Sequence, residues 1–190
     1  MQYELIRTIK DDTVLSPSLP RLGVRIGSDF IYLGDVQYIA RDSFHVEEFI
    51  FINPNSAGHV TQLLLVHFEG YLENRDGMYE YITRPTVDLD GEKYLYDVQF
   101  IELQDYLNQR PNSDLAHAAD YIRQRSYTLA GDFIFQRFIR AVGEEQRDEF
   151  VILYLERNEN PACTPEDLGQ NPELAASLQQ RALDSFTIVH

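Results

Sequence analysis

The sequence predicts an α+β fold that is mainly β, a curved antiparallel sheet or barrel with two helices packed outside. Three observations lead to this expectation: about nine or ten short runs rich in β-branched and aromatic residues, compact turns between several of them, and few helical stretches. A β-sandwich is the alternative, because closure depends on whether the first and last strands pair. No linker interrupts the 190 residues, so a single domain, 1–190, is expected.

The predicted strands are spread over most of the chain. They lie at Tyr3–Ile9, Leu22–Ile26, Phe30–Leu33, Val36–Ala40, Phe44–Ile52, Val60–Tyr71, Met78–Thr83, Tyr94–Leu103, Asp132–Val142 and Glu149–Arg157. Asp90-Gly91 is the sharpest turn signal, since Gly91 can adopt the positive φ of a type I′ hairpin. Longer hairpin loops are expected at 53–58 and 143–147. Short connections of this kind favour antiparallel neighbours, because parallel pairs need a crossover segment.

Two stretches have helical signals. The first runs from Ser113, a good N-cap, to about Arg125, and its apolar residues fall on one stripe. The second begins at Asn171-Pro172, where Asn caps and Pro occupies the first helical position, and continues to about Leu183. A last strand is expected at Phe186–Val189. Both helices are expected to pack on the sheet.

Composition limits the classes of partner and location. The net charge of −15 repels phosphate backbones and anionic lipid surfaces, so neither nucleic acid nor membrane is expected as a partner. The N-terminus lacks the features of a secretion signal, and no run of residues is long and apolar enough to cross a bilayer. Cys163 is the lone cysteine and suits a reducing compartment. A soluble, cytoplasmic protein is therefore expected.

A cluster of histidine and glutamate is the first candidate site. If Ile52 pairs with Val60 in the hairpin of Phe44–Ile52 and Val60–Tyr71, then His45 faces His67. Alternation then adds carboxylates to the same face, so the candidate metal ligands are His45, His67, Glu47 and Glu69. Imidazole and carboxylate together bind zinc, iron or manganese, and a His–carboxylate pair can also act as a general base. The alternative is a set of ordinary polar pairs near the sheet end, because a slip of one residue separates the histidines.

Arg137 is the second candidate, because it shares a strand face with Phe135 and other apolar residues. A guanidinium in an apolar row needs a carboxylate or an anionic ligand. Arg137, Phe135, His45 and His67 are therefore the predicted ligand-binding residues. The alternative is internal pairing of Arg137 with Glu149, Glu102 or another of the 31 acidic residues, or a position on an exposed face.

Three hypotheses on function follow from these candidates. The first is a small-molecule-binding protein with an apolar pocket lined by some of the 12 tyrosines, which join an apolar ring to a polar tip. The second is a metal-dependent enzyme that uses the His/Glu cluster of the 44–71 hairpin and a divalent metal cofactor. The third is an acidic interaction module, such as a homodimer formed through exposed edge strands. Motifs for phosphate loops, hydrolase elbows and kinases are not found in the sequence.

Overall fold

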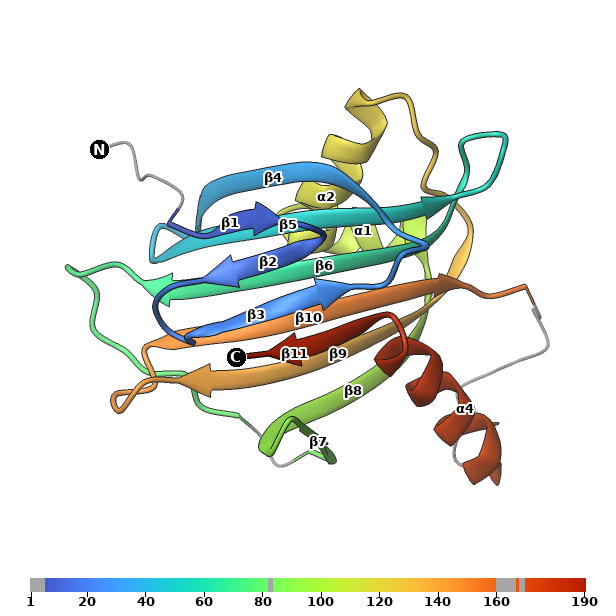
Figure 1. Cartoon of the computed structure of the whole chain (residues 1–190). Coiled ribbons are helices and arrows are strands. Elements are labelled where there is room, and N and C mark those ends of the chain that lie inside the picture. Colours follow the sequence, from blue (N-terminus) through green and yellow to red (C-terminus); the bar gives the residue numbers. More distant parts are fainter. Residues whose placement is uncertain (1–5, 82–83, 160–166, 168–169) are drawn as a thin grey trace.

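A computed structural model describes residues 6–81, 84–159, 167 and 170–190 of the chain, and it consists of two antiparallel sheets with helices around them (Figure 1). The small sheet has the order β1-β2-β3-β11 and the large sheet the order β4-β5-β6-β10-β9-β8-β7. The small sheet covers one face of the large sheet, and α1 and α2 lie on the other side (Figure 1). α4 lies beside one end of the small sheet.

The elements have the following bounds. The strands of the small sheet are β1 (Thr8–Lys10), β2 (Thr13–Ser16), β3 (Leu22–Ile26) and β11 (Phe186–Val189). Those of the large sheet are β4 (Ile31–Ala40), β5 (Phe44–Pro54), β6 (Val60–Tyr71), β7 (Thr86–Leu89), β8 (Glu92–Glu102), β9 (Asp132–Val142) and β10 (Asp148–Arg157). The helices are α1 (Leu103–Gln109), α2 (Asp114–Gln124) and α4 (Pro172–Leu183).

The large sheet separates two hydrophobic cores. Between the sheets, Phe49, Phe51, Leu64, Val66 and Phe150 pack against residues of the small sheet. On the other face, the alternate residues of the same strands pack under the two helices; they include Ile50, Ile52, Leu63, Leu65 and Leu153. Because both faces of β5, β6 and β10 are covered, these strands have nearly continuous apolar sequences.

The predicted mainly antiparallel β fold with helices packed outside is confirmed. Among the described residues, β4 and β7 form the two edges of the large sheet. The sheet therefore stays open, and the arrangement is sandwich-like instead of a closed barrel. The Asp90-Gly91 hairpin is also confirmed, since Leu89 pairs with Glu92 and both turn residues have positive φ. The predicted homodimer through edge strands stays a prediction.

Three local predictions are wrong. Phe30–Leu33 and Val36–Ala40 belong to one strand, β4, instead of two. Met78–Tyr81 is not a strand, and Thr83 at the end of that predicted run lies outside the described residues, as do Tyr3 and its neighbours to residue 5. Leu103 begins α1 instead of ending a strand, because the Glu102 carboxylate caps the helix by accepting hydrogen bonds from the amides of Gln104 and Asp105. Both helices predicted from N-cap signals are present, and β11 follows the second of them.

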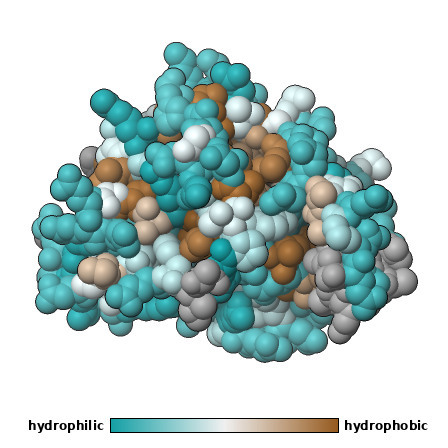
Figure 2. Space-filling model, turned by 90° about the horizontal axis from the view of Figure 1, so that it is seen from below, coloured by the Kyte–Doolittle hydropathy of each residue, from teal (hydrophilic) through white to brown (hydrophobic). Residues whose placement is uncertain are grey.

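The face of the molecule that is seen from below is largely polar (Figure 2). Figure 2 shows that hydrophilic residues dominate the face seen from below, with hydrophobic residues in several separate areas. This agrees with the net charge of −15. No helix among the described residues has the length and apolar character needed to span a membrane.

Candidate functional site

The register of the β5–β6 hairpin differs from the predicted one and changes the site. Ile52 pairs with Leu63 instead of Val60. Pro54 pairs with Val60, and this pair by itself would keep the predicted alternation. A bulge between Asn53 and Pro54 then shifts the pairing of the rest of the hairpin by one residue. A shift of one residue exchanges the two faces of the strand. The predicted register is therefore wrong, and His67 faces Glu48.

The four predicted metal ligands are thereby divided between two faces. His45 pairs with Gly70 and, with Glu47, lines a cavity of about 680 Å³ on the side of the small sheet. There the guanidinium of Arg7 lies 3.3 Å from the Glu47 carboxylate. His67 and Glu69 lie on the face under α1 and α2. The set His45, His67, Glu47 and Glu69 is therefore not brought together.

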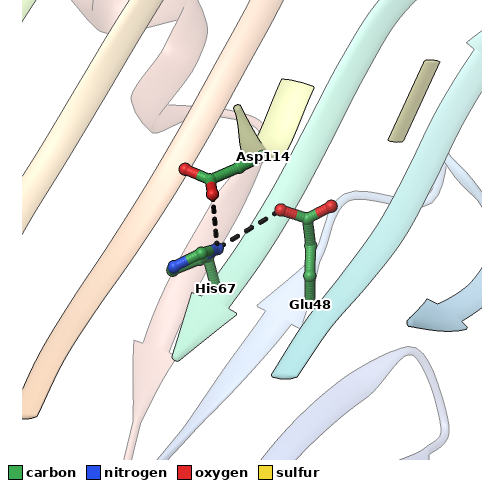
Figure 3. A group of neighbouring side chains, drawn as sticks. All are labelled: Glu48, His67 and Asp114. Atoms are coloured by element: carbon green, nitrogen blue, oxygen red, sulfur yellow. Dashed lines mark hydrogen bonds and ion pairs between the residues drawn. The ribbon is translucent and has the colours of Figure 1, made fainter. Parts of the chain in front are cut away.

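Three elements bring Glu48, His67 and Asp114 together instead. Glu48 lies in β5, His67 in β6, and Asp114 is the first residue of α2 (Figure 3). His67 Nδ1 lies 3.3 Å from Glu48 Oε2 and 4.0 Å from Asp114 Oδ1. One ligand atom from each of the three residues can be chosen such that all lie within 4.8 Å of one another. Sequence reasoning found only His67 of these three.

The depth of the three side chains differs. Glu48 is wholly buried and the His67 side chain is 2% exposed, whereas 39% of the Asp114 side chain is exposed. Glu48 Oε1 is buried and has no hydrogen-bond partner among the described residues. An unpaired carboxylate oxygen in the interior is costly unless a proton or a cation compensates it. Glu48 and His67 thus form the floor of the cluster, and Asp114 its open side.

Tyrosine hydroxyl groups hold the surrounding carboxylates. Tyr38 donates to Asp114 Oδ1 at 2.9 Å, and its ring stacks on His117 of α2. Two tyrosines of the segment after β6 reach back to the sheet: Tyr79 donates to Glu69 at 2.6 Å, and Tyr81 donates to Glu149 on β10. Glu69 lies 3.7 Å from His67 Nε2, so it faces the ring nitrogen on the far side from Glu48. These tyrosines fall in or near predicted strands, but their partners depend on the tertiary fold.

Burial and charge change the proton affinities within the cluster. Burial raises the pKa of Glu48 to about 7, although contact with His67 opposes the increase. Burial alone would lower the pKa of His67, but the charge of Asp114 and the contact with Glu48 raise it well above its ordinary value. Burial also raises the pKa of Glu149. With His67 protonated, the carboxylates of the cluster outnumber its cation only once Glu48 has lost its proton.

The cluster opens into a cleft. Glu69, Asp114, Arg137 and Glu149 line this cleft, which has a volume of about 850 Å³. Its other walls come from the end of β4, the segment after β6 and the loop between α1 and α2. A smaller recess of about 190 Å³ shares Asp114, Arg137 and Glu149 with the cleft. Of the three residues of the cluster, Asp114 is the one that lines the cleft, whereas Glu48 and His67 lie buried behind it.

Arg137 and Phe135, predicted as ligand-binding residues, have different surroundings. Arg137 pairs internally, as the alternative expected, with Asp97 on the neighbouring strand β8, and its side chain is 26% exposed toward the cleft and the recess. Phe135 is 2% exposed and packs against Tyr106 of α1, so it belongs to the core. Of the two, Arg137 lines the cleft.

The arrangement supports two kinds of chemistry. Imidazole and carboxylate groups can hold a divalent cation, and a buried His–Glu pair can also take up and release a proton.

No family model, curated protein or solved structure matches the chain.

Proposed function

We propose that the protein binds a divalent cation at Glu48, His67 and Asp114, and that the cation holds a small molecule in the cleft above it or acts on that molecule. The observation that carries this proposal is the convergence of three side chains from three separate elements, with the carboxylate of Glu48 wholly buried and one of its oxygens unpaired. A metal-dependent function is thereby proposed again, with Glu48 and Asp114 in place of His45 and Glu47, and with Glu69 as an outer partner of His67 instead of a ligand.

The distances suit an ion of ordinary size. Ligand atoms that lie about 2.1 Å from an ion are about 3.0 Å apart at right angles and about 4.2 Å apart on opposite sides. His67 Nδ1 is 3.3 Å from Glu48 and 4.0 Å from Asp114. Small side-chain rotations would therefore complete the coordination. One imidazole with carboxylates favours zinc, iron or manganese.

The surroundings of His67 also support a cation at Nδ1. In metal sites, a coordinating histidine usually directs its other ring nitrogen at a carboxylate or carbonyl group that fixes its orientation. Glu69 takes this place at Nε2 and is itself held by Tyr79. Tyr38 orients Asp114 in the same way. These three groups would fix the ligands before the cation arrives.

A bound cation would contribute Lewis acidity or an activated water at the floor of the cleft. Such chemistry needs an open side for a substrate, and the exposed edge of Asp114 borders that opening. Glu149, which also lines the cleft, and Tyr81, which lines the adjoining recess, would position the reacting molecule. The identity of this molecule determines whether the site is catalytic.

Elemental mass spectrometry of untagged protein, purified without chelators and then titrated with Zn²⁺ or Mn²⁺, tests the proposal. We expect about one equivalent per chain and an increase in Tm upon binding. Glu48→Gln and His67→Gln each remove a ligand. The cation affinity of each variant should fall by more than the roughly 10- to 100-fold loss that is typical when an outer partner of a metal ligand is removed.

The sequence offers matched controls. Glu47→Gln and His45→Gln change the same residue types on the same hairpin but on the opposite face, so they should retain the cation. Unfolding of the metal-free variants by urea verifies that each is folded. Absence of stoichiometric binding in the wild type, or equal losses in the test and control variants, would refute the proposed site.

A further inference from the structure

We infer that the ligand of this cleft is a small organic anion, whose carboxylate or phosphate group lies between the bound cation and Arg137. The inference rests on the proposed function for the cation end only. The other end rests on the charges around Arg137, which belong to the described structure.

Two arginines share one carboxylate at this end of the site. Asp97 on β8 contacts the guanidinium of Arg137 and lies 2.7 Å from that of Arg84. Burial alone would raise the pKa of Asp97, but hydrogen bonds and the two positive charges lower it. The three side chains together carry one net positive charge.

Arg137 also retains unused capacity for hydrogen bonds. Its Nε is buried and has no hydrogen-bond partner among the described residues. The remaining donors of a guanidinium form a planar fork that matches carboxylate and phosphate oxygens. A partly buried arginine with an unpaired donor is stabilised by such an anion.

The arginines and the carboxylates of this site line the same recess. Arg84, Arg137, Asp114 and Glu149 all line the recess of about 190 Å³, and the last three also line the larger cleft. Without a cation, Asp114 and Glu149 would repel an anion. With a divalent cation at Glu48, His67 and Asp114, the same anion can contact the cation at one side and Arg137 at the other.

The walls of the cleft favour a flat apolar body on this anion. Phe44, Tyr71, Tyr79 and Tyr106 line it, and the rings of Phe44 and Tyr71 are 4.5 Å apart between centroids. Aromatic walls contribute contact area to planar ligands. An aromatic carboxylate or phosphate is therefore the ligand class that fits both the charges and the walls.

Benzoate, phenylphosphonate and the neutral analogue benzamide distinguish charge from shape. In titration calorimetry on Zn²⁺-loaded protein, we expect one of the two anions to bind at least about 10-fold more tightly than benzamide, which has the same ring. Whichever anion binds more tightly identifies the carboxylate or the phosphate source. In Co²⁺-loaded protein, this anion should also change the visible absorption spectrum, which a ligand remote from the ion would not.

Arg137→Gln should remove most of the preference for the anion, and Arg137→Lys should restore part of it. Asp97 keeps Arg84 and Gln99 as partners in these variants, so it is not left unpaired. Arg140→Gln is the matched control, because Arg140 lies on the opposite face of the same strand and pairs with Glu92.

The two proposals fail in different ways. If the protein holds stoichiometric cation but binds benzamide as well as both anions, or if Arg137→Gln retains the preference, the inference on the ligand class is wrong and the cation site stands. If elemental analysis finds no cation bound after titration, the proposed function is wrong.

Discussion

Glu47 and Glu48 are neighbours in β5, and both are almost completely buried. Because strand residues alternate, the two carboxylates point to opposite faces of the large sheet. Glu47 pairs with Arg7 between the sheets, whereas Glu48 faces His67 under the helices. Two adjacent acids within an apolar run are therefore a signal that both faces of the strand are covered and that each face has a polar site.

The pH dependence of stability tests the state of Glu48 in the metal-free protein. The pKa of Glu48 is raised from 4.5 to about 7 in the folded state, so the folded state binds more protons than the unfolded state between these values. Stability then decreases as pH rises through this window. A shift of this size corresponds to roughly 3 kcal/mol.

Urea unfolding of wild type and Glu48→Gln between pH 4.5 and 8 measures this effect. Glutamine mimics the protonated acid, so the wild type should lose stability relative to the variant as pH rises. The raised pKa of His67 acts in the same direction, since its protonated form stabilises the fold below about pH 6.5 and this contribution is lost as pH rises through the folded pKa. A stability difference between the two proteins that is constant with pH would contradict the raised pKa of Glu48.

At the scale of elements, the start of α2 positions the open side of the cluster. Ser113 caps the helix by accepting a hydrogen bond from the amide of Ala116, and Asp114 follows directly. Leu115, Ala118 and Ile122 fix the helix on the sheet. The N-cap signal predicted this helix and its first residue correctly. The sequence could not predict that the helix begins above His67, because local signals contain no information on where a helix docks.

Ser113→Ala should therefore affect both stability and cation binding. Loss of the cap costs about 1 kcal/mol and loosens the turn that holds Asp114. We expect the Zn²⁺ affinity to fall several-fold, as measured by titration calorimetry. Asn171→Ala is the control, since Asn171 caps α4 by accepting from the amide of Leu174. Asn171→Ala should reduce stability by a similar amount and leave the Zn²⁺ affinity unchanged. An equal loss of affinity in both variants would show that the effect does not come from the start of α2.

At the scale of the whole molecule, the large sheet is shared by the two cores. Leu64 and Leu65 are neighbours in β6 and both are fully buried, but Leu64 packs toward the small sheet and Leu65 under the helices. Since the same strands support both cores, the loss of either core weakens the other. The single domain stays a prediction, which cooperative unfolding of core variants can test.

Leu64→Ala and Leu65→Ala should each reduce the free energy of unfolding by about 2–5 kcal/mol. Both variants should keep one cooperative transition, with coincident urea curves from far-UV circular dichroism and tyrosine fluorescence. A biphasic transition in one variant, with the small sheet unfolding first, would show that the two halves unfold separately and that the single-domain prediction is wrong.

Local sequence signals were enough to predict the mainly antiparallel β class, several strands, the Asp90-Gly91 hairpin, the starts of α2 and α4 and the last strand. These features depend on residues close together in the chain, such as caps, turn residues and alternating patterns. His67 and Arg137 were found in the same way, because a polar residue in an apolar strand is visible locally. The residues that surround His67 and Arg137 could not be found from such local signals.

The open sheets and the members of the cluster depend on contacts between distant segments and could not be predicted from local signals. One bulged residue, Thr61 of β6, exchanges the faces of β5 relative to β6, and thereby replaces His45 and Glu47 with Glu48 as the neighbour of His67. Asp114 comes from a helix more than 40 residues further along the chain and reaches the same point only through packing. The physical reason is that strand alternation amplifies a one-residue shift into a change of face, while docking depends on contacts between distant segments.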